Sequence, residues 1–182
     1  MDLIYFNSPV VLSFFFISLF ALILKYITKD VSNVLLFSTY RSSLLSPFTY
    51  LRFITHIFGH QSWSHFMNNF LIILIVGPLV EEKYGSTNLL YMILITAFVT
   101  GIISFIFSRN RLLGASGIAY MLICLSSFAN IASGKIPLTL ILVFIFYIVN
   151  EIFSSIFMKD GVSHFGHLIG AICGIIFGFF PL

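Results

Sequence analysis

Long apolar stretches alternate with short polar segments along the chain, and this alternation predicts the fold. A helix needs about 20 mainly apolar residues to cross the hydrocarbon core of a bilayer. Six stretches approach this length, and we expect each to form a membrane-spanning helix: Pro9–Ile27, Ser64–Val80, Leu89–Phe107, Ala115–Ser133, Pro137–Glu151 and His164–Phe180. The pattern predicts an all-α, multi-pass membrane protein in which residues 1–182 form one domain.

The polar connections between these helices differ in length and character. The longest, residues 28–63, mixes aromatic residues with serine and arginine, which is typical of a segment lying in the membrane interface. The connection Ser154–Ser163 is placed to fold over a cavity as a flap. Because successive spans run in opposite directions, the second, fourth and sixth helices all begin on one face of the membrane. Side chains at these three helix starts are expected at similar depth.

Composition excludes a soluble domain. Hydrophobic residues make up 59% of the chain and charged residues only 8%, whereas about 25% of the residues of a soluble domain are charged. The net charge of +3 comes from scattered residues rather than a basic cluster, so we expect no nucleic-acid partner. Cys124 and Cys173 both lie within apolar stretches, which favours buried packing thiols over a disulfide.

The segment Gly114-Ala115-Ser116-Gly117 lies where the fourth predicted helix begins. Its glycines, Gly114 and Gly117, allow a sharp turn and let another helix or a substrate approach Ser116 closely. Amides in the first turn of a helix lack intrahelical acceptors, so the Ser116 N–H is available to stabilise an oxyanion. Ser116 is therefore a candidate nucleophile. A helix cap or a small-residue packing site is the structural alternative.

His167 opens the sixth predicted helix, and glycines follow it on the same helical face. Gly170 and Gly174 have the spacing that lets two helices pack closely, and the helix that begins with Ser116 is the expected neighbour. His167 is a candidate general base, and a satisfied polar residue at a helix interface is the alternative. Tyr120, about one turn after Ser116, is placed to stack on the imidazole or to hydrogen-bond to it.

His65 and Asn69 lie four residues apart near the start of the second helix and share one face. Both side chains can donate hydrogen bonds, and donors aimed at developing negative charge supply much of the rate in acyl transfer. They are candidate oxyanion donors, together with the Ser116 amide. The alternative is a polar pair that joins two helices. Every Asp and Glu lies at the end of an apolar stretch or in a connection, so we expect a Ser-His dyad rather than a triad.

His56 and His60 are also four residues apart and are the candidate metal ligands of the chain. No carboxylate lies near them in the sequence, and there is no His-Glu-x-x-His motif. We therefore expect neither a metal nor another cofactor.

Taken together, these residues resemble the rhomboid family of intramembrane serine proteases, of the bacterial GlpG type, over roughly residues 47 to 181. The resemblance rests on His65-x-x-x-Asn69, Gly114-x-Ser116-Gly117, Tyr120 and Gly166-His167-x-x-Gly170-x-x-x-Gly174. The Glu-x-Arg common in the family after the second helix is Glu81-Glu82-Lys83 in this chain. The resemblance predicts a minimal six-helix form without a cytosolic N-terminal domain.

The resemblance implies a serine endopeptidase in which Ser116 is the nucleophile and His167 the general base. It implies His65, Asn69 and the Ser116 amide as oxyanion donors, and Tyr120 as the residue that stacks on His167. The expected substrates are transmembrane segments of other proteins, and the expected surroundings are the lipids of a bacterial inner membrane. An inactive relative that binds membrane clients without cutting them is the alternative. A small transporter is disfavoured because the chain shows no convincing internal repeat.

Charge and resemblance predict opposite orientations in the membrane. Of nine basic residues, only Lys83 and Lys135 fall on the face of the even-numbered connections, and the other seven fall on the opposite face. The positive-inside rule would place the more basic face in the cytoplasm, whereas the resemblance places that face outside. We expect the orientation of the family, because the rule weakens for a long interfacial connection.

A transmembrane substrate cannot leave the bilayer, so its route to Ser116 must open sideways to lipid. We expect the substrate to pass between the fifth and second helices. The fifth helix is the weakest wall, because Pro137 interrupts its start and it lacks a glycine packing stripe. Phe146 and Phe153 are the candidate gate residues.

Overall fold

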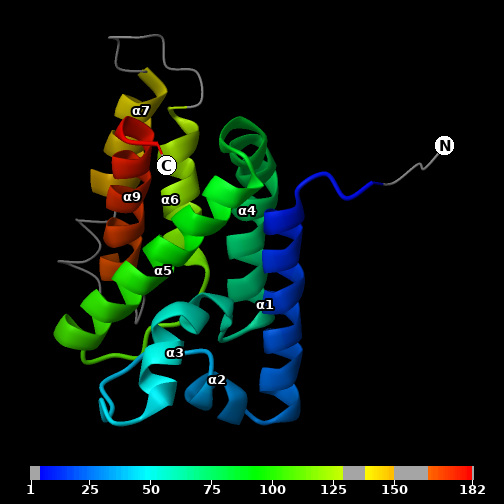
Figure 1. The fold of residues 1–182 in the computed structure, drawn as a ribbon, viewed down its shortest axis with the longest axis vertical. Coiled ribbons are helices and arrows are strands. Elements are labelled where there is room, and N and C mark those ends of the chain that lie inside the picture. Colours follow the sequence, from blue (N-terminus) through cyan, green and yellow to red (C-terminus); the bar gives the residue numbers. More distant parts are fainter. Residues whose placement is uncertain (1–4, 129–137, 150–163, 182) are drawn as a thin grey trace.

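The computed structural model describes residues 5–128, 138–149 and 164–181, and these residues form helices and connecting loops (Figure 1). Within them no β-strand occurs, and the prediction of an all-α fold is confirmed. The helical elements are α1 (Pro9–Ile27), α2 (Val31–Leu35), α3 (Pro47–Thr55), the 3-10 turn η1 (His56–Phe58), α4 (Trp63–Tyr84), α5 (Ser86–Phe107), α6 (Ser116–Ser126), α7 (Leu138–Val143), the π-helical turn η2 (Phe144–Val149) and α9 (His164–Phe179).

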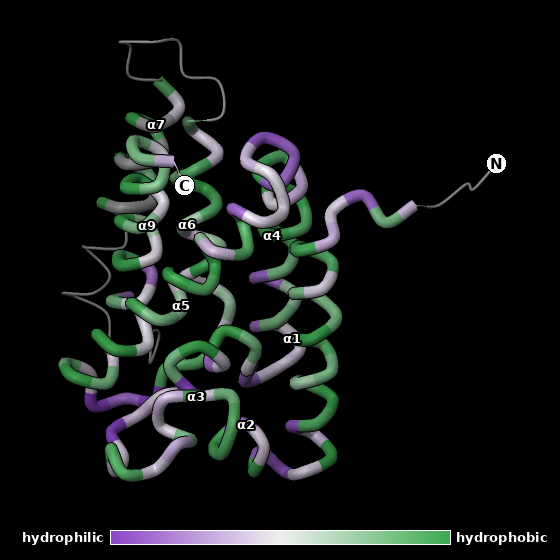
Figure 2. The backbone as a smooth tube through the Cα atoms, in the orientation of Figure 1, coloured by the Kyte–Doolittle hydropathy of each residue, from purple (hydrophilic) through white to green (hydrophobic). Residues whose placement is uncertain are grey.

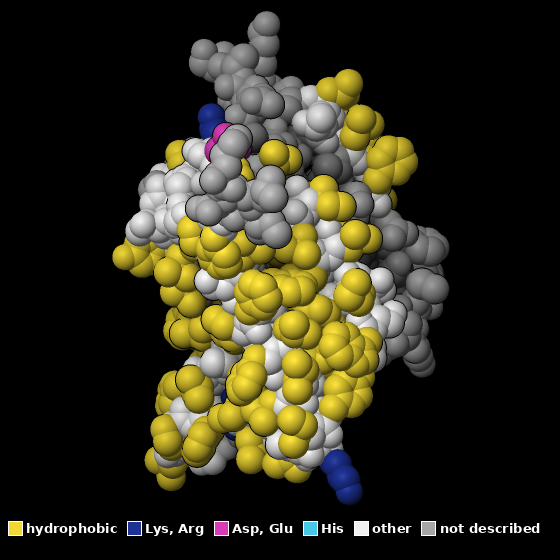
Figure 3. All heavy atoms as spheres, turned by 90° about the vertical axis from the view of Figure 1, so that its right-hand side faces the viewer, with side chains coloured by type: hydrophobic (Ala, Val, Ile, Leu, Met, Phe, Trp, Pro, Cys, Tyr) yellow, Lys and Arg dark blue, Asp and Glu magenta, His cyan; other side chains and the backbone are white. Residues whose placement is uncertain are grey.

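Among the described residues, three helices are long and apolar enough to cross a membrane, as judged by length and composition. They are α1 with 19 residues, and α4 and α5 with 22 residues each. Two shorter apolar helices, α6 and α9, lie beside them. Hydrophobic residues run along the helices (Figure 2), and apolar side chains cover the face that carries α1, with charged groups visible only near its ends (Figure 3).

Two of the predicted helices end elsewhere. The helix predicted to stop at Val80 continues to Tyr84. It can include the charged residue Glu81 because the buried carboxylate of Glu81 is hydrogen-bonded to the start of α1. This carboxylate accepts hydrogen bonds from the amides of Val10 at 3.0 Å and Val11 at 3.1 Å. Those amides open α1 and have no intrahelical acceptor, and a negative charge at a helix N-terminus is favourable.

The helix predicted over Ala115–Ser133 begins at Ser116 and ends at Ser126. Residues 127 and 128 form a turn, and residues 129–133 lie outside the described residues. The side-chain hydroxyl groups of Ser126 and Ser127 both donate to the carbonyl oxygen of Ile123, at 2.8 and 3.3 Å. Such local side-chain bonds compete with continued helical pairing. The apolar run alone therefore overestimated the length of this helix.

The segment 28–63 contains α2, α3 and η1, which lie at the lower end of the bundle in Figure 1. The buried guanidinium of Arg52 holds it together by donating to Ser42 Oγ at 2.7 Å and by lying 4.5 Å from the ring centroid of Tyr40. Around α3 the segment exposes large apolar side chains at Leu44, Leu45, Phe48, Tyr50 and Leu51. This exposure is compatible with the predicted interfacial position, which stays a prediction.

The helices pack so that the starts of α4, α6 and α9 lie at the same end of the bundle (Figure 1). A common core joins α1, α4, α5, α6 and α9, and it includes the buried side chains of Phe14, Phe70, Met92, Leu122 and Ile169. This packing fixes the three helix starts relative to one another, and the candidate site is built from them.

Candidate active site

Ser116 and His167 come together although they are 51 residues apart in the sequence. Ser116 is the first residue of α6, and His167 lies in the first turn of α9. Ser116 Oγ lies 2.8 Å from His167 Nε2, which is hydrogen-bond distance. Both side chains are half-buried, so the pair is shielded yet accessible. A hydroxyl in contact with an imidazole nitrogen is the arrangement that can activate a serine as a nucleophile.

Glycines allow α6 and α9 to approach closely enough for this contact. A Cβ atom placed on Gly170 would overlap the carbonyl oxygen of Gly117, and one on Gly174 would overlap the carbonyl oxygen of Met121. A Cβ atom on Gly117 itself would lie 3.3 Å from the carbonyl oxygen of Gly166. The two backbones are therefore in direct contact along this seam, which sets the position of His167 relative to Ser116.

Tyr120 stacks on His167. The two ring centroids are 4.5 Å apart and the ring planes differ by 9°. The ring of His164 approaches the imidazole of His167 edge-on, with the centroids 6.3 Å apart. The tyrosine therefore restricts the plane in which the His167 ring can lie, one turn above Ser116.

Residues 108–115, which we call the approach loop, lead from α5 into Ser116. Gly114 has a φ of 123°, a conformation that favours glycine. A Cβ atom on Gly114 would also lie 2.8 Å from His65 Nε2 and 3.7 Å from Asn69 Nδ2. Gly114 therefore lies ahead of the helix, against the two polar side chains of α4, rather than in the seam between α6 and α9.

Asn69 carries an unpartnered donor beside this loop. The residue is 7% exposed, and among the described residues its Nδ2 atom has no hydrogen-bond partner. A buried donor without a partner costs free energy, and such a group at a candidate active site is explained if a ligand supplies the acceptor. Asn68, its neighbour in the sequence, is exposed.

The second half of the approach loop is held by the segment 28–63. Leu112 and Thr39 exchange two backbone hydrogen bonds of 2.9 Å. The Gly114 amide donates to the His56 carbonyl at 3.0 Å, and the Ala115 amide lies 3.4 Å from His60 Nε2. Four hydrogen bonds therefore fix the backbone directly before Ser116.

His56 and His60, which the sequence offered only as metal ligands, are structural supports of this loop. Burial lowers the pKa of His56 to about 4, against the opposing effect of its backbone hydrogen bonds, among them the 3.2 Å bond from Nδ1 to the Arg52 carbonyl. Burial and the nearby His65 lower the pKa of His60 to about 3. Both imidazoles are thus neutral, and over the described part of the chain no three metal-binding side chains gather.

A small cavity lies behind Ser116. Its volume is about 10 Å³, and its lining includes His56, Thr100, Gly114, Ser116 and Gly166. A space of roughly 10–15 Å³ holds one water molecule when polar partners are present. The imidazole of His56 and the hydroxyl of Thr100, 3.4 Å apart, are such partners.

Of the two candidate gate residues, the structure describes only Phe146. Phe146 lies in η2 with 68% of its surface exposed. Phe153 and the predicted flap Ser154–Ser163 lie outside the described residues.

Apolar helices around a half-buried polar cluster define an integral membrane protein with an all-α fold. The family model of the Rhomboid domain matches residues 47–182, and this chain belongs to the rhomboid family. The predicted resemblance is thereby confirmed at the level of the family, while the GlpG type and the six-helix form stay predictions.

Two curated relatives illustrate the range of the family. Rhomboid-related protein 1 of Caenorhabditis elegans is 31% identical over 147 residues, which cover 72% of this chain and 40% of that protein. Rhomboid protease GlpG of Salmonella newport (strain SL254) is 30% identical over 109 residues, which cover 58% of this chain and 40% of that protein. The chain thus spans about 40% of the length of the relatives it matches.

Proposed function

We propose that this chain is an intramembrane serine endopeptidase that acts through a Ser116–His167 dyad. The observation that carries the proposal is the 2.8 Å contact between Ser116 Oγ and His167 Nε2 at the start of two apolar helices. Membership of the rhomboid family and similarity to a protein named a rhomboid protease support it. The stack of Tyr120 on His167 provides the orientation that a carboxylate supplies in a triad.

The proposed reaction begins when His167 Nε2 accepts the proton of Ser116 as Oγ attacks the scissile carbonyl carbon. The resulting oxyanion is stabilised by the Ser116 amide, Asn69 Nδ2–H and His65 Nε2–H. His167 then passes its proton to the leaving amine, and a water activated by the same imidazole hydrolyses the acyl-enzyme. The cavity beside Thr100 supports this second step, since it has room for such a water near Ser116.

The proposed substrates are transmembrane segments of other membrane proteins. The dyad lies among helices that are surrounded by lipid, so a segment already in the bilayer reaches it without crossing an aqueous phase. Lateral access beside η2, with Phe146 and Phe153 as gate residues, belongs to this proposal and is supported by the exposure of Phe146. The bacterial inner membrane stays the predicted location, and the similarity to a bacterial relative supports it.

Covalent labelling tests the proposal directly. A fluorophosphonate reacts with an activated serine oxygen and loses fluoride, so it is expected to label Ser116 in the folded protein. The labelled peptide is identified by mass spectrometry. Labelling should be lost in His167→Ala and after denaturation. If the folded wild-type protein leaves Ser116 unmodified under conditions that label an active serine protease, the alternative of an inactive client-binding protein is favoured.

Asn69→Ala is expected to slow cleavage by less than the loss of Ser116. One oxyanion donor is worth roughly 10²–10³ in rate in soluble enzymes, and here His65 and an amide share the load, so the expected loss is about 10–100-fold. The assay is the rate of cleavage of a transmembrane reporter in detergent. Asn68→Ala, an exposed change at the adjacent position, is the matched control. An unchanged rate combined with a lower Tm would instead show that Asn69 only joins helices.

A further inference from the structure

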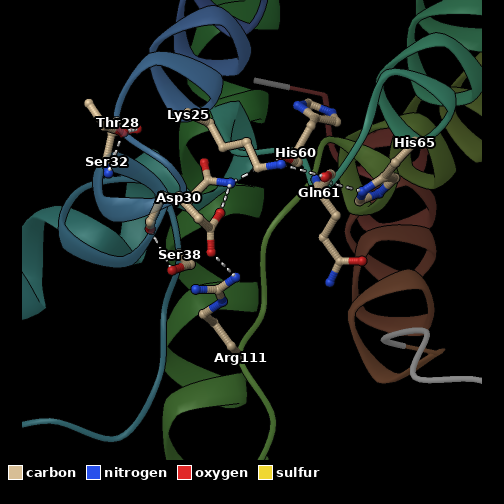
Figure 4. Close-up of polar contacts among 10 residues, drawn as sticks. Lys25, Thr28, Asp30, Ser32, Ser38, His60, Gln61, His65 and Arg111 are labelled. Atoms are coloured by element: carbon tan, nitrogen blue, oxygen red, sulfur yellow. Dashed lines mark hydrogen bonds and ion pairs between the residues drawn. The ribbon is translucent and has the colours of Figure 1, made fainter.

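The backbone around Gln61 is held in place by side chains from outside the candidate site (Figure 4). Lys25 Nζ, at the end of α1, donates to the Gln61 carbonyl oxygen at 3.1 Å. Asn33 Nδ2, in α2, donates to the His60 carbonyl oxygen at 3.1 Å. The peptide group between His60 and Gln61 then presents its N–H to His65 Nδ1 at 3.4 Å. The two anchors therefore fix the amide that meets the His65 ring.

This amide determines which nitrogen of His65 carries the proton. A neutral imidazole has one donor nitrogen and one acceptor nitrogen, and the partner of one nitrogen sets the state of the other. A peptide N–H can only donate, so His65 Nδ1 must be the acceptor and the proton must be on Nε2. Nε2 faces Gly114 and the approach loop to Ser116, which makes it a donor toward the site.

The orientation of the Asn33 amide is itself fixed. Asn33 is fully buried, and its Nδ2 atom donates both to Asp30 Oδ1 at 3.0 Å and to the His60 carbonyl. Rotating the amide by 180° would place its oxygen against two acceptors, so only one orientation satisfies both contacts. Because the His60 carbonyl accepts a bond, the N–H of the same peptide group becomes a stronger donor to His65.

Asp30 connects this arrangement to the approach loop. Its second carboxylate oxygen, Oδ2, lies 3.0 Å from Arg111 Nη2 in an ion pair that spans 81 residues of sequence. Asp30 also has a φ of 72°, which Asp and Asn tolerate better than most residues. The two loops that flank the His65 ring are therefore joined through the side chains of Arg111, Asp30 and Asn33.

We propose that Lys25, Asp30 and Asn33 are positioning residues that hold His65 in the tautomer with its proton on Nε2, so that the ring offers a donor rather than a lone pair to an oxyanion at Ser116. This inference rests on the proposed function, because it assigns His65 a role in the same reaction. With the opposite tautomer, Nδ1–H would face the Gln61 N–H, and a lone pair would face the negative charge.

The tautomer is measured by ¹⁵N NMR of histidine-labelled protein in detergent, because protonated and unprotonated ring nitrogens have well-separated shifts. His65 is assigned by the signals that disappear in His65→Gln. The wild-type protein is expected to show a proton on Nε2 of His65, and Lys25→Met a mixture of both tautomers. Lys25→Arg restores the charged donor and should restore the wild-type spectrum. Lys29→Met removes an exposed charge close by and should leave the spectrum unchanged.

Asp30 supplies a second, independent pair of variants. Asp30→Gly and Asp30→Asn both suit a positive φ, but only the asparagine retains an acceptor for Asn33. Asp30→Gly is therefore expected to mix the tautomers, and Asp30→Asn to mix them less. In cleavage assays the variants that mix the tautomers should lower kcat in proportion to the remaining fraction of Nε2-protonated His65, about twofold for an equal mixture, with little change in KM.

Two results would overturn the inference: a proton on Nδ1 of His65 in the wild-type protein, or an unchanged tautomer in both Lys25→Met and Asp30→Gly. The spectrum does not depend on turnover. If the protein cleaves no reporter but Lys25→Met still shifts the tautomer, the positioning role stands and the proposed function fails.

Discussion

Ser116→Ala and His167→Ala are each expected to abolish cleavage of a transmembrane reporter while leaving a folded protein. In the proposed dyad the hydroxyl and the imidazole act as one unit across their 2.8 Å contact, so losing either would remove the activated nucleophile. By comparison with a soluble serine protease the loss should be on the order of 10⁶ in kcat, and the double variant should be little worse than either single one. The measurement is reporter cleavage by purified protein in detergent, with Tm recorded for each variant.

Ser126→Ala is the matched control for this experiment. Ser126 lies on the same helix, and its hydroxyl bonds only to a carbonyl of the preceding turn among the contacts described, so its loss should leave cleavage intact. Substantial residual cleavage in Ser116→Ala would rule out the serine mechanism. Inhibition of the wild-type protein by a chelator would point instead to a metal.

Gly170→Val is expected to remove most of the activity without touching the dyad chemically. The first added carbon already overlaps the Gly117 carbonyl oxygen, so α9 must move away from α6 and carry His167 with it. A shift of about 1 Å in a reacting group can cost on the order of 10²-fold in rate. The measurement combines cleavage rate with Tm in detergent, and both should fall.

Ile172→Val provides the comparison on the same helix, because Ile172 is 54% exposed and faces away from α6. This variant should resemble the wild-type protein in rate and in Tm. If Gly170→Val also kept full activity and an unchanged Tm, the close contact between α6 and α9 would not control the position of His167.

The ends of some helices follow from the sequence because they coincide with the ends of apolar runs. The bounds of α1 were predicted as observed, and those of α9 differ by one residue. The end of α4 could not be predicted in this way, because Glu81 owes its burial to amides that lie 70 and 71 residues away. The short helices α2 and α3 were also missed, since they have only five and nine residues and fall below the length of a membrane-spanning stretch.

In the candidate site, too, local sequence patterns predicted some residues, whereas contacts between distant residues could not be predicted. Local spacing pointed to His65 with Asn69 and to Ser116 with Tyr120, because residues one helical turn apart share a face. The spacing of His56 and His60 was equally visible, but it says nothing about the approach loop that they support. The ion pair of Asp30 with Arg111 leaves no local signal, since one partner is in a turn and the other in a loop far along the chain.

The bonds that hold the approach loop involve residues that precede the matched family domain. The matched Rhomboid domain begins at residue 47, yet Thr39 pairs with Leu112 and Asp30 pairs with Arg111 directly ahead of Ser116. Cutting the chain at the domain boundary would delete Thr39 and Asp30. It would also delete α1, whose first amides are hydrogen-bonded to Glu81. The proposed nucleophile Ser116 is thus held in place by residues upstream of the matched domain, and fragments designed from the family boundary alone would lack these contacts.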